Sequence, residues 1–272
     1  MRENMQYILP EGYEGHPAVY ILTALLAFSM TGISKGGFGG VAVLAIPLMM
    51  LVSPGKLALG IWMPLLILCD IFTIRMYPKE WSLRPIALLA PWMCVGLGVG
   101  YLLLGRIDDR TMKLFVGCLS IGFVLLEIAR ARMARNLAAH QERPAWRPTW
   151  LSAAPFGIVG GVCSLIAHAA GAVTAIYLLA QRMDRREFVG TSARFYIVFN
   201  TLRIPLYASP SIGVLTREAL IKSLWLVPFV PLTIWLGSVL NRRMSPTTFN
   251  RTVSVLLAVS GAYLVYDNLP GR

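Results

Sequence analysis

Long apolar runs separated by short polar stretches make up most of this 272-residue chain. These runs cover residues 18–34, 38–52, 57–77, 83–105, 111–130, 150–165, 168–181, 188–208, 219–240 and 247–266. About 20 apolar residues are enough for a helix to cross the hydrocarbon core of a bilayer. The pattern therefore predicts an all-α polytopic membrane protein, with the lipid bilayer as its surroundings.

The composition supports that prediction and narrows the function. Hydrophobic residues make up 56% of the chain and charged residues only 14%, whereas a soluble domain carries about a quarter charged residues. The net charge of +12 comes mostly from short loops between apolar runs, where cytoplasmic placement and anionic lipid account for it. No nucleic-acid partner is expected. The four cysteines lie far apart in apolar segments, and we interpret them as buried packing residues rather than metal ligands.

An arginine-rich linker divides the chain into two halves with a similar order of segments. We predict a tail at 1–17, a transmembrane repeat at 18–130, a basic cytoplasmic linker at 131–149, a second repeat at 150–267 and a tail at 268–272. Shifting the sequence by 130 positions aligns residues 42–48 with 172–178, and five of those seven pairs are identical. Such ordered similarity predicts an internal repeat of the kind found in transporters.

The distribution of Lys and Arg predicts how the two halves are oriented. If the first run of each half is a broken-helix hairpin that enters and leaves on one side, 14 basic residues lie inside and 8 outside. If each first run is one continuous span, the division is 12 against 10, so the positive-inside rule favours hairpins. We therefore predict two inverted repeats, each a broken-helix hairpin plus three transmembrane helices, with both termini periplasmic.

The two hairpin tips are the first candidates for a binding site. Residues 34–40 read Ser-Lys-Gly-Gly-Phe-Gly-Gly within an apolar run, and a lysine in hydrocarbon is costly unless it has a partner or a wet cavity. The second tip spans residues 164–171. Helices that leave the tips point their N-termini at the centre, which favours an anion. Alternatively, the glycines only permit close helix packing. The candidate tip residues are Lys35, Gly37, Phe38, Gly39, Gly40, His168, Ala169 and Gly171.

A polar stripe in the run 188–208 supplies the other candidates. Tyr196, Asn200, Arg203 and Tyr207 are spaced to share one helical face, which should point away from lipid. The planar guanidinium of arginine suits an oxyanion. We expect Lys35, Arg194 and Arg203 to neutralise the charge of the anion. Asn200 would orient the anion, and the two tyrosines would form the walls of the pocket. Alternatively, each arginine forms a structural ion pair or a contact at the cytoplasmic edge of the membrane.

Two further residues are candidates for ion coupling. Asp70 is expected either to pair with Lys35, which we favour, or to take a coupling proton. His168 is either a proton carrier or a neutral helix cap. The sequence contains no Ser-His-Asp order, metal-ligand cluster or phosphate-binding loop, so we predict neither an enzyme nor a bound cofactor. An intramembrane enzyme, which would release an altered substrate, is the opposing possibility.

These motifs resemble the sulfite exporter TauE/SafE family. The resemblance is carried by residues 32–40 with Pro47, by residues 167–171 with 177–179, and by residues 188–191 followed by Asn200, Arg203, Pro205 and Tyr207. It implies a bacterial inner-membrane transporter that moves sulfite or organosulfonates by alternating access. A passive channel, or a transporter of another small oxyanion or carboxylate, is the alternative.

The chain also departs from the family pattern. Ala172 and Val173 stand where members often have prolines, Arg194 where the residue is usually apolar, and Arg203 where lysine is common. Two arginines would suit an anion that is larger or more highly charged than sulfite.

Overall fold

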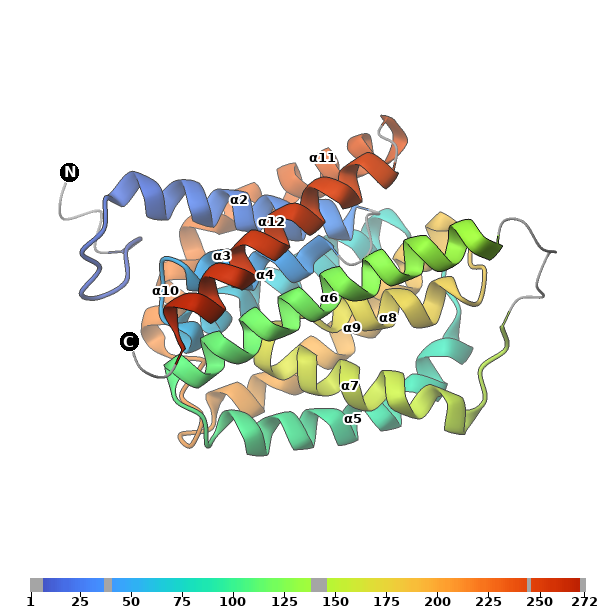
Figure 1. Ribbon diagram of the computed structural model, residues 1–272, viewed down its shortest axis with the longest axis horizontal. Helices are drawn as coiled ribbons and strands as arrows, with labels where there is room; N and C mark the ends of the chain where they lie inside the picture. Colours follow the sequence, from blue (N-terminus) through green and yellow to red (C-terminus); the bar gives the residue numbers. More distant parts are fainter. Residues whose placement is uncertain (1–6, 37–40, 138–145, 244–245, 270–272) are drawn as a thin grey trace.

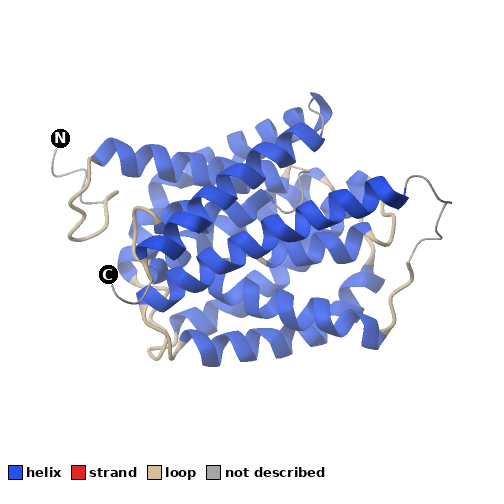
Figure 2. Ribbon diagram, in the orientation of Figure 1, coloured by secondary structure: helices blue, strands red, loops and turns tan. Residues whose placement is uncertain are grey.

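The described part of the chain is built from helices. The computed structural model describes residues 7–36, 41–137, 146–243 and 246–269, and these ranges contain no strand (Figure 1, Figure 2). The first half contains α2 (Pro17–Lys35), η1 (Val41–Leu44), α3 (Ala45–Met50), α4 (Gly55–Met76), α5 (Leu83–Leu104) and α6 (Asp109–Leu137). The second half contains α7 (Trp150–Ala167), α8 (Ala170–Leu179), α9 (Arg185–Ala208), α10 (Arg217–Ser223), η2 (Leu224–Phe229), α11 (Val230–Arg243) and α12 (Pro246–Asp267).

Several of these helices have the length and composition of membrane spans. Six helical stretches among the described residues qualify, namely Pro17–Lys35, Gly55–Met76, Leu83–Leu104, Asp109–Ala129, Trp150–Ala167 and Arg217–Leu240. Helix α9 has 24 residues, and at 1.5 Å per residue it is roughly 36 Å long, which also exceeds the hydrocarbon core. The predicted all-α polytopic class is confirmed.

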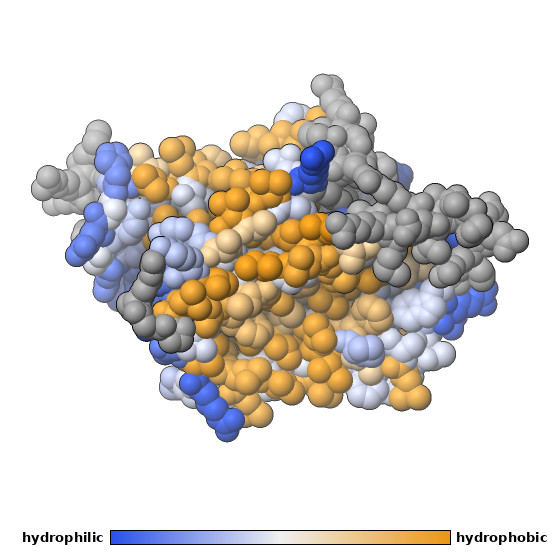
Figure 3. All heavy atoms as spheres, viewed as in Figure 1, coloured by the Kyte–Doolittle hydropathy of each residue, from blue (hydrophilic) through white to orange (hydrophobic). Residues whose placement is uncertain are grey.

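The surface agrees with this class. Figure 3 shows an apolar belt across the middle of the molecule and hydrophilic residues toward its ends. Large apolar side chains such as Leu22, Leu151, Leu224 and Val259 are more than 60% exposed. A monomeric soluble protein rarely exposes contiguous apolar patches larger than a few hundred Å². We conclude that this is a multi-pass membrane protein whose apolar belt faces lipid.

Among the described residues, the first apolar run of each half is divided between two helices, as the sequence predicts. The first apolar run ends its helix at Lys35, and the chain resumes at Val41 with η1 and α3. The run that begins at Trp150 is interrupted by His168 and Ala169, between α7 and α8. The apolar helices that follow the interruptions, Val41–Met50 and Ala170–Leu179, are too short to cross a bilayer.

The helices of the two halves pack in corresponding pairs. Helix α2 packs on α11 and α7 packs on α5, while α4 packs on α9 and α6 on α12. In Figure 1, α2 and α7 run in opposite directions, and so do α6 and α12. The inverted-repeat arrangement and its domain boundaries stay predictions, and this pairing is what such an arrangement requires. Helix α6 continues to Leu137, beyond the predicted repeat boundary at 130.

Two glycines interlock the central helices α4 and α9. A Cβ atom on Gly190 of α9 would lie 1.9 Å from the carbonyl oxygen of Glu80, in the segment that follows α4. A Cβ atom on Gly60 of α4 would lie 2.2 Å from the carbonyl oxygen of Val214, in the segment that follows α9. The two glycines are related by the same shift of 130 positions that aligns the halves. Each central helix is therefore crossed closely by the segment that follows the other.

Candidate substrate-binding cavity

A cavity of about 50 Å³, lined by both apolar and polar side chains, lies beside the ends of α2 and α7. A single water molecule needs about 10–15 Å³ on the same measure, so the cavity has room for several waters or one small anion. It is lined by the ends of α2 and α7, by η1, by the first turn of α8 and by α4 and α9. Its polar lining residues are Ser34, Lys35, Thr73, Ser164, His168, Ser192, Tyr196, Asn200 and Arg203.

At the first interruption, Lys35 ends helix α2 and reaches the cavity. Its Nζ forms an ion pair with Oδ1 of Asp70, a fully buried carboxylate on α4. The same ammonium lies 4.2 Å from the ring centroid of Tyr196, close enough for a cation–π contact. A lysine inside a membrane requires a partner, and for Lys35 this partner is Asp70. The sequence favoured this pairing.

A chain of hydrogen bonds continues from Asp70 to Arg203. Asn200 Nδ2 donates to Asp70 Oδ2 at 2.6 Å, and Asn200 Oδ1 accepts from Nη2 of Arg203. Nη1 of Arg203 donates to the carbonyl oxygen of Ser164 at 2.5 Å and to Nδ1 of His168 at 2.6 Å. Two cations, Lys35 and Arg203, thus share one carboxylate. With a neutral His168, the network carries one net positive charge.

Two polar atoms at the cavity are buried without a partner. Nε of Arg203 and Oγ of Ser192 form no hydrogen bond among the described residues. A buried donor without a partner costs about 1–3 kcal/mol, so such groups point to a missing ligand or water. Ser192 is not among the residues predicted from the sequence. It lies one helical turn before Tyr196, and extending the polar stripe by four residues would have included it.

At the second interruption, His168 adopts a left-handed backbone conformation, with φ 49° and ψ 26°. This region costs a residue other than glycine on the order of 1 kcal/mol. The side chain compensates by contacting two other helices. Its Nδ1 accepts from Arg203, and its Nε2 lies 3.0 Å from the carbonyl oxygen of Leu59 on α4. Ala169, which follows, is buried, and Gly171 in the first turn of α8 lines the cavity.

The two predicted tyrosines have different positions. Tyr196 lines the cavity, and its hydroxyl contacts Oγ1 of Thr174 on α8. Tyr207 lies behind the cavity wall, where its hydroxyl donates to the carbonyl oxygen of Leu165 at 2.5 Å. Its ring packs edge-on against His168, with 5.7 Å between ring centroids. Tyr207 therefore supports His168 rather than facing the cavity.

Arg194 lies away from the cavity. Its Nη1 donates to the carbonyl oxygen of Tyr77 at 3.0 Å, and its Nη2 donates to that of Pro78 at 2.7 Å. The guanidinium also lies 4.9 Å from the ring centroid of Trp81. Nine residues separate Arg194 from Arg203, and at 100° per residue this places the two on opposite faces of α9. The structure therefore places Arg194 in an edge contact with the α4–α5 connection, the alternative that the sequence left open.

The remaining predicted tip residues, Gly37, Phe38, Gly39 and Gly40, lie outside the described residues. Gly36, which precedes them, packs closely against α11, since a Cβ atom there would lie 2.6 Å from the backbone of Gly237. For this glycine, close helix packing is the role that the structure supports.

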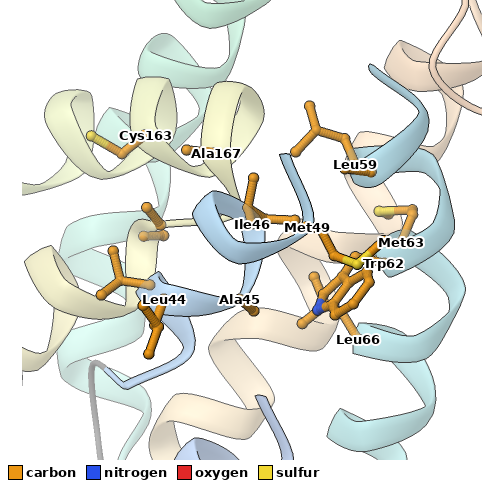
Figure 4. Close-up of a cluster of buried hydrophobic side chains, with 14 of the residues drawn as sticks. Leu44, Ala45, Ile46, Met49, Leu59, Trp62, Met63, Leu66, Cys163 and Ala167 are labelled. Carbon is orange, nitrogen blue, oxygen red and sulfur yellow. The ribbon is translucent and has the colours of Figure 1, made fainter. Parts of the chain in front are cut away.

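An apolar cluster borders the cavity on one side. Figure 4 shows Ile46 and Met49 of α3 packed against Leu59, Trp62 and Met63 of α4. The cavity is lined by Leu66 and Thr73, further along α4 toward Met76. The cavity thus lies beside the second half of α4, where Leu66 belongs both to its lining and to the apolar cluster, and close apolar packing occupies the first half.

A helical membrane protein with broken helices around a buried cationic cavity has the architecture of a transporter. The family model for the sulfite exporter TauE/SafE family matches residues 24–264, and the chain belongs to that family. No match is found among curated proteins or among solved structures. The family resemblance seen in the sequence motifs is confirmed, and the protein is a multi-pass membrane transporter by family.

Proposed function

We propose that this protein is a secondary transporter that moves a small sulfur oxyanion, sulfite or a small sulfonate, across the bacterial inner membrane by alternating access. The observation that carries the proposal is the buried guanidinium of Arg203, which lines a small cavity, contacts no carboxylate directly among the described residues and has an unpartnered Nε there. An anion in this cavity would neutralise the net charge. It would also give Arg203 Nε and Ser192 Oγ an acceptor, which both lack among the described residues.

The size of the cavity supports a small anion. About 50 Å³ suits an oxyanion of a few heavy atoms and leaves little room for an aromatic sulfonate. The sequence suggested a larger or more highly charged anion because it contains two intramembrane arginines. Since Arg194 is held by the carbonyl groups of Tyr77 and Pro78, only Arg203 remains at the cavity. A second cavity arginine is therefore not available to bind a larger or more highly charged anion.

The apolar cluster supports alternating access over a passive channel. A channel needs a continuous polar path, whereas Ile46, Met49, Leu59 and Trp62 are at most 1% exposed. We infer that this cluster closes the cavity toward the Gly55 end of α4, which the positive-inside argument makes periplasmic. Transport would then require the cluster to separate while the opposite end closes.

Anion flux into proteoliposomes tests the proposal. Sulfite, methanesulfonate and an arenesulfonate are compared for the wild type, Arg203→Ala and Arg203→Lys. We expect saturable flux of the two small anions and at least a tenfold loss in Arg203→Ala, because a hydrogen bond to a charged group contributes about 1.5–3 kcal/mol. Arg203→Lys keeps the charge but loses the planar fork, so it should retain an intermediate flux.

The matched control is Arg194→Ala, on the opposite face of the same helix. We expect its flux per folded molecule to remain within about twofold of the wild type, since it does not line the cavity. Flux in Arg203→Ala equal to that of the wild type would remove Arg203 from the site. Flux that rises linearly with concentration, without saturation, would favour a channel instead.

A further inference from the structure

The hydrogen bonds of His168 define which of its ring nitrogens carries the proton. A guanidinium can only donate, so Nδ1 of His168 must accept from Arg203 Nη1 at 2.6 Å. The other nitrogen, Nε2, lies 3.0 Å from the carbonyl oxygen of Leu59, which can only accept. The ring is therefore neutral and protonated at Nε2, and its single lone pair is directed at Arg203.

We propose that His168 is the proton-binding site that couples anion movement to protons, an inference that rests on the proposed transport of an oxyanion. When a proton from solution binds Nδ1, the resulting imidazolium can no longer accept from Arg203. One N–H of Arg203 Nη1 then needs a new acceptor, while the other still donates to the carbonyl oxygen of Ser164, and the anion in the cavity provides that acceptor. The Nε2–H bond to Leu59 remains in both states, so the ring stays in place while its other contact changes.

The charges around the ring make proton and anion binding mutually dependent. Among the described residues, the charges that act on His168 are those of Arg203 on α9 and Lys35 on α2. Tyr207 packs against its ring, Tyr196 lines the same cavity, and Asp70 on α4 is joined to Arg203 through Asn200. Both cations oppose a third positive charge unless an anion enters with it. Asp70 offsets only one of them, because both its oxygens are already engaged by Lys35 and Asn200. By linkage, if a bound proton raises the affinity for the anion, the bound anion raises the affinity for the proton by the same factor.

Asp70 is a poorer candidate for the same role. A proton on either of its oxygens would weaken its bond to Lys35 or to Asn200 and leave the lysine without its counter-charge. His168 loses only a bond to a group that the substrate can satisfy. His168 also occupies the strained connection between α7 and α8 and contacts Leu59 at the border of the apolar cluster. A change in its contacts therefore acts directly on the junction that transport has to move.

The test counts protons and anions together in the same proteoliposomes. An outward anion gradient is imposed at zero membrane potential, with sulfite or methanesulfonate as the anion, and an internal pH dye reports the protons that move. Methanesulfonate keeps its charge across this pH range. The comparison variant is His168→Asn, because asparagine tolerates the left-handed conformation and its amide oxygen accepts from Arg203, yet it does not titrate.

We expect about one proton per anion in the wild type and none in His168→Asn, whatever its residual rate of transport. A ratio that is equal in the two proteins would overturn the assignment of His168, and it would indicate that the proton travels elsewhere or on sulfite itself. Anion flux in the wild type without any proton movement would overturn the inference and leave the transport function intact. No flux of either anion in the wild type would instead refute the proposed function.

A second measurement keeps the inference testable if His168→Asn does not fold. The affinity of the purified wild type for methanesulfonate, measured by thermal shift, should tighten by up to about tenfold per pH unit as the pH falls from 8 to 5, because proton binding and anion binding favour each other. An affinity that is constant between pH 8 and pH 5 would contradict a coupled proton on the protein.

Discussion

At the first helix interruption, Lys35 is neutralised by Asp70, and both residues come from the same half of the chain. At the second interruption, His168 and Arg203 meet without a carboxylate of their own among the described residues, and Asn200 connects them to Asp70. The first half therefore supplies the cavity with an ion pair, whereas the second supplies its net charge. The two halves have related sequences, yet substitutions in them should have different consequences: loss of stability in the first and loss of anion binding in the second.

The largest expected effect on stability comes from Asp70→Leu. This change leaves the ammonium of Lys35 buried without a counter-charge, and breaking a buried ion pair in this way costs about 3–5 kcal/mol. The double variant Lys35→Met with Asp70→Leu should recover most of that loss, because two apolar side chains replace both charges. Denaturation midpoints in mixed micelles measure both effects. If the double variant is as unstable as the single one, the ion pair is not the source of the effect.

The glycine interlock offers a comparison in which the two halves should behave alike. Gly190→Ala places a Cβ atom 1.9 Å from a backbone oxygen and Gly60→Ala places one at 2.2 Å, so each should destabilise by about 1–3 kcal/mol. Gly98→Ala is the matched control, since nothing lies within 4 Å of its Cβ position. That control should be neutral or stabilising by up to about 1 kcal/mol. Equal denaturation midpoints for all three variants would show that the two crossings are not tightly packed.

Much of this arrangement follows from local sequence patterns. Glycines after Lys35 predict the first interruption, and the spacing of Tyr196, Asn200 and Arg203 places them on one face. Arg194 marks the limit of such patterns: an intramembrane arginine indicates a buried partner, but only the fold shows that its partners include the carbonyl groups of Tyr77 and Pro78. Tyr77 and Pro78 lie 117 and 116 residues before Arg194 in the sequence. Helical periodicity relates only residues that are close in sequence, so it cannot predict this contact.

The predicted run 219–240 illustrates a second limit of the sequence patterns. In the structure it is divided into α10, η2 and α11, with Pro228 inside the 3₁₀ segment. A proline removes one backbone donor and disfavours an α-helix at that point. Hydropathy alone cannot detect the change because every side chain from 224 to 229 is apolar. The apolar cluster beside the cavity was missed for the same reason, since its residues look like any other part of a span.

A smaller effect is expected from Arg194→Gln, at a position whose counterpart in the first half is Pro64. The loss of three bonds to backbone carbonyl groups, two of them in the α4–α5 connection, and of the contact with Trp81 should destabilise by about 1–2 kcal/mol. The apparent affinity for the transported anion should stay within about twofold, since Arg194 is remote from the cavity. A weaker affinity at unchanged stability would return Arg194 to the binding site.

The smallest expected effect concerns how the first long helix of each half begins. Helix α7 begins with a capping box, in which Ser152 N donates to Thr149 Oγ1 at 3.3 Å and Thr149 N donates to Ser152 Oγ at 2.8 Å. Helix α2 has only the 3.3 Å bond from Ala18 N to Nδ1 of His16, and Pro17 needs no partner for its nitrogen.

We therefore expect Thr149→Ala to destabilise by about 1 kcal/mol and His16→Ala by less than about 0.5 kcal/mol. Hydrogen exchange at the first amides of α7 and α2 measures each local effect. Ser152→Ala removes the same capping box in α7 and should speed exchange there to a similar degree. Faster exchange in α2 than in α7 after the paired substitutions would mean that the tail before α2 contributes more to its start than the single His16 bond. In that case the two halves would differ at their first turns as well as in the charges that they bring to the cavity.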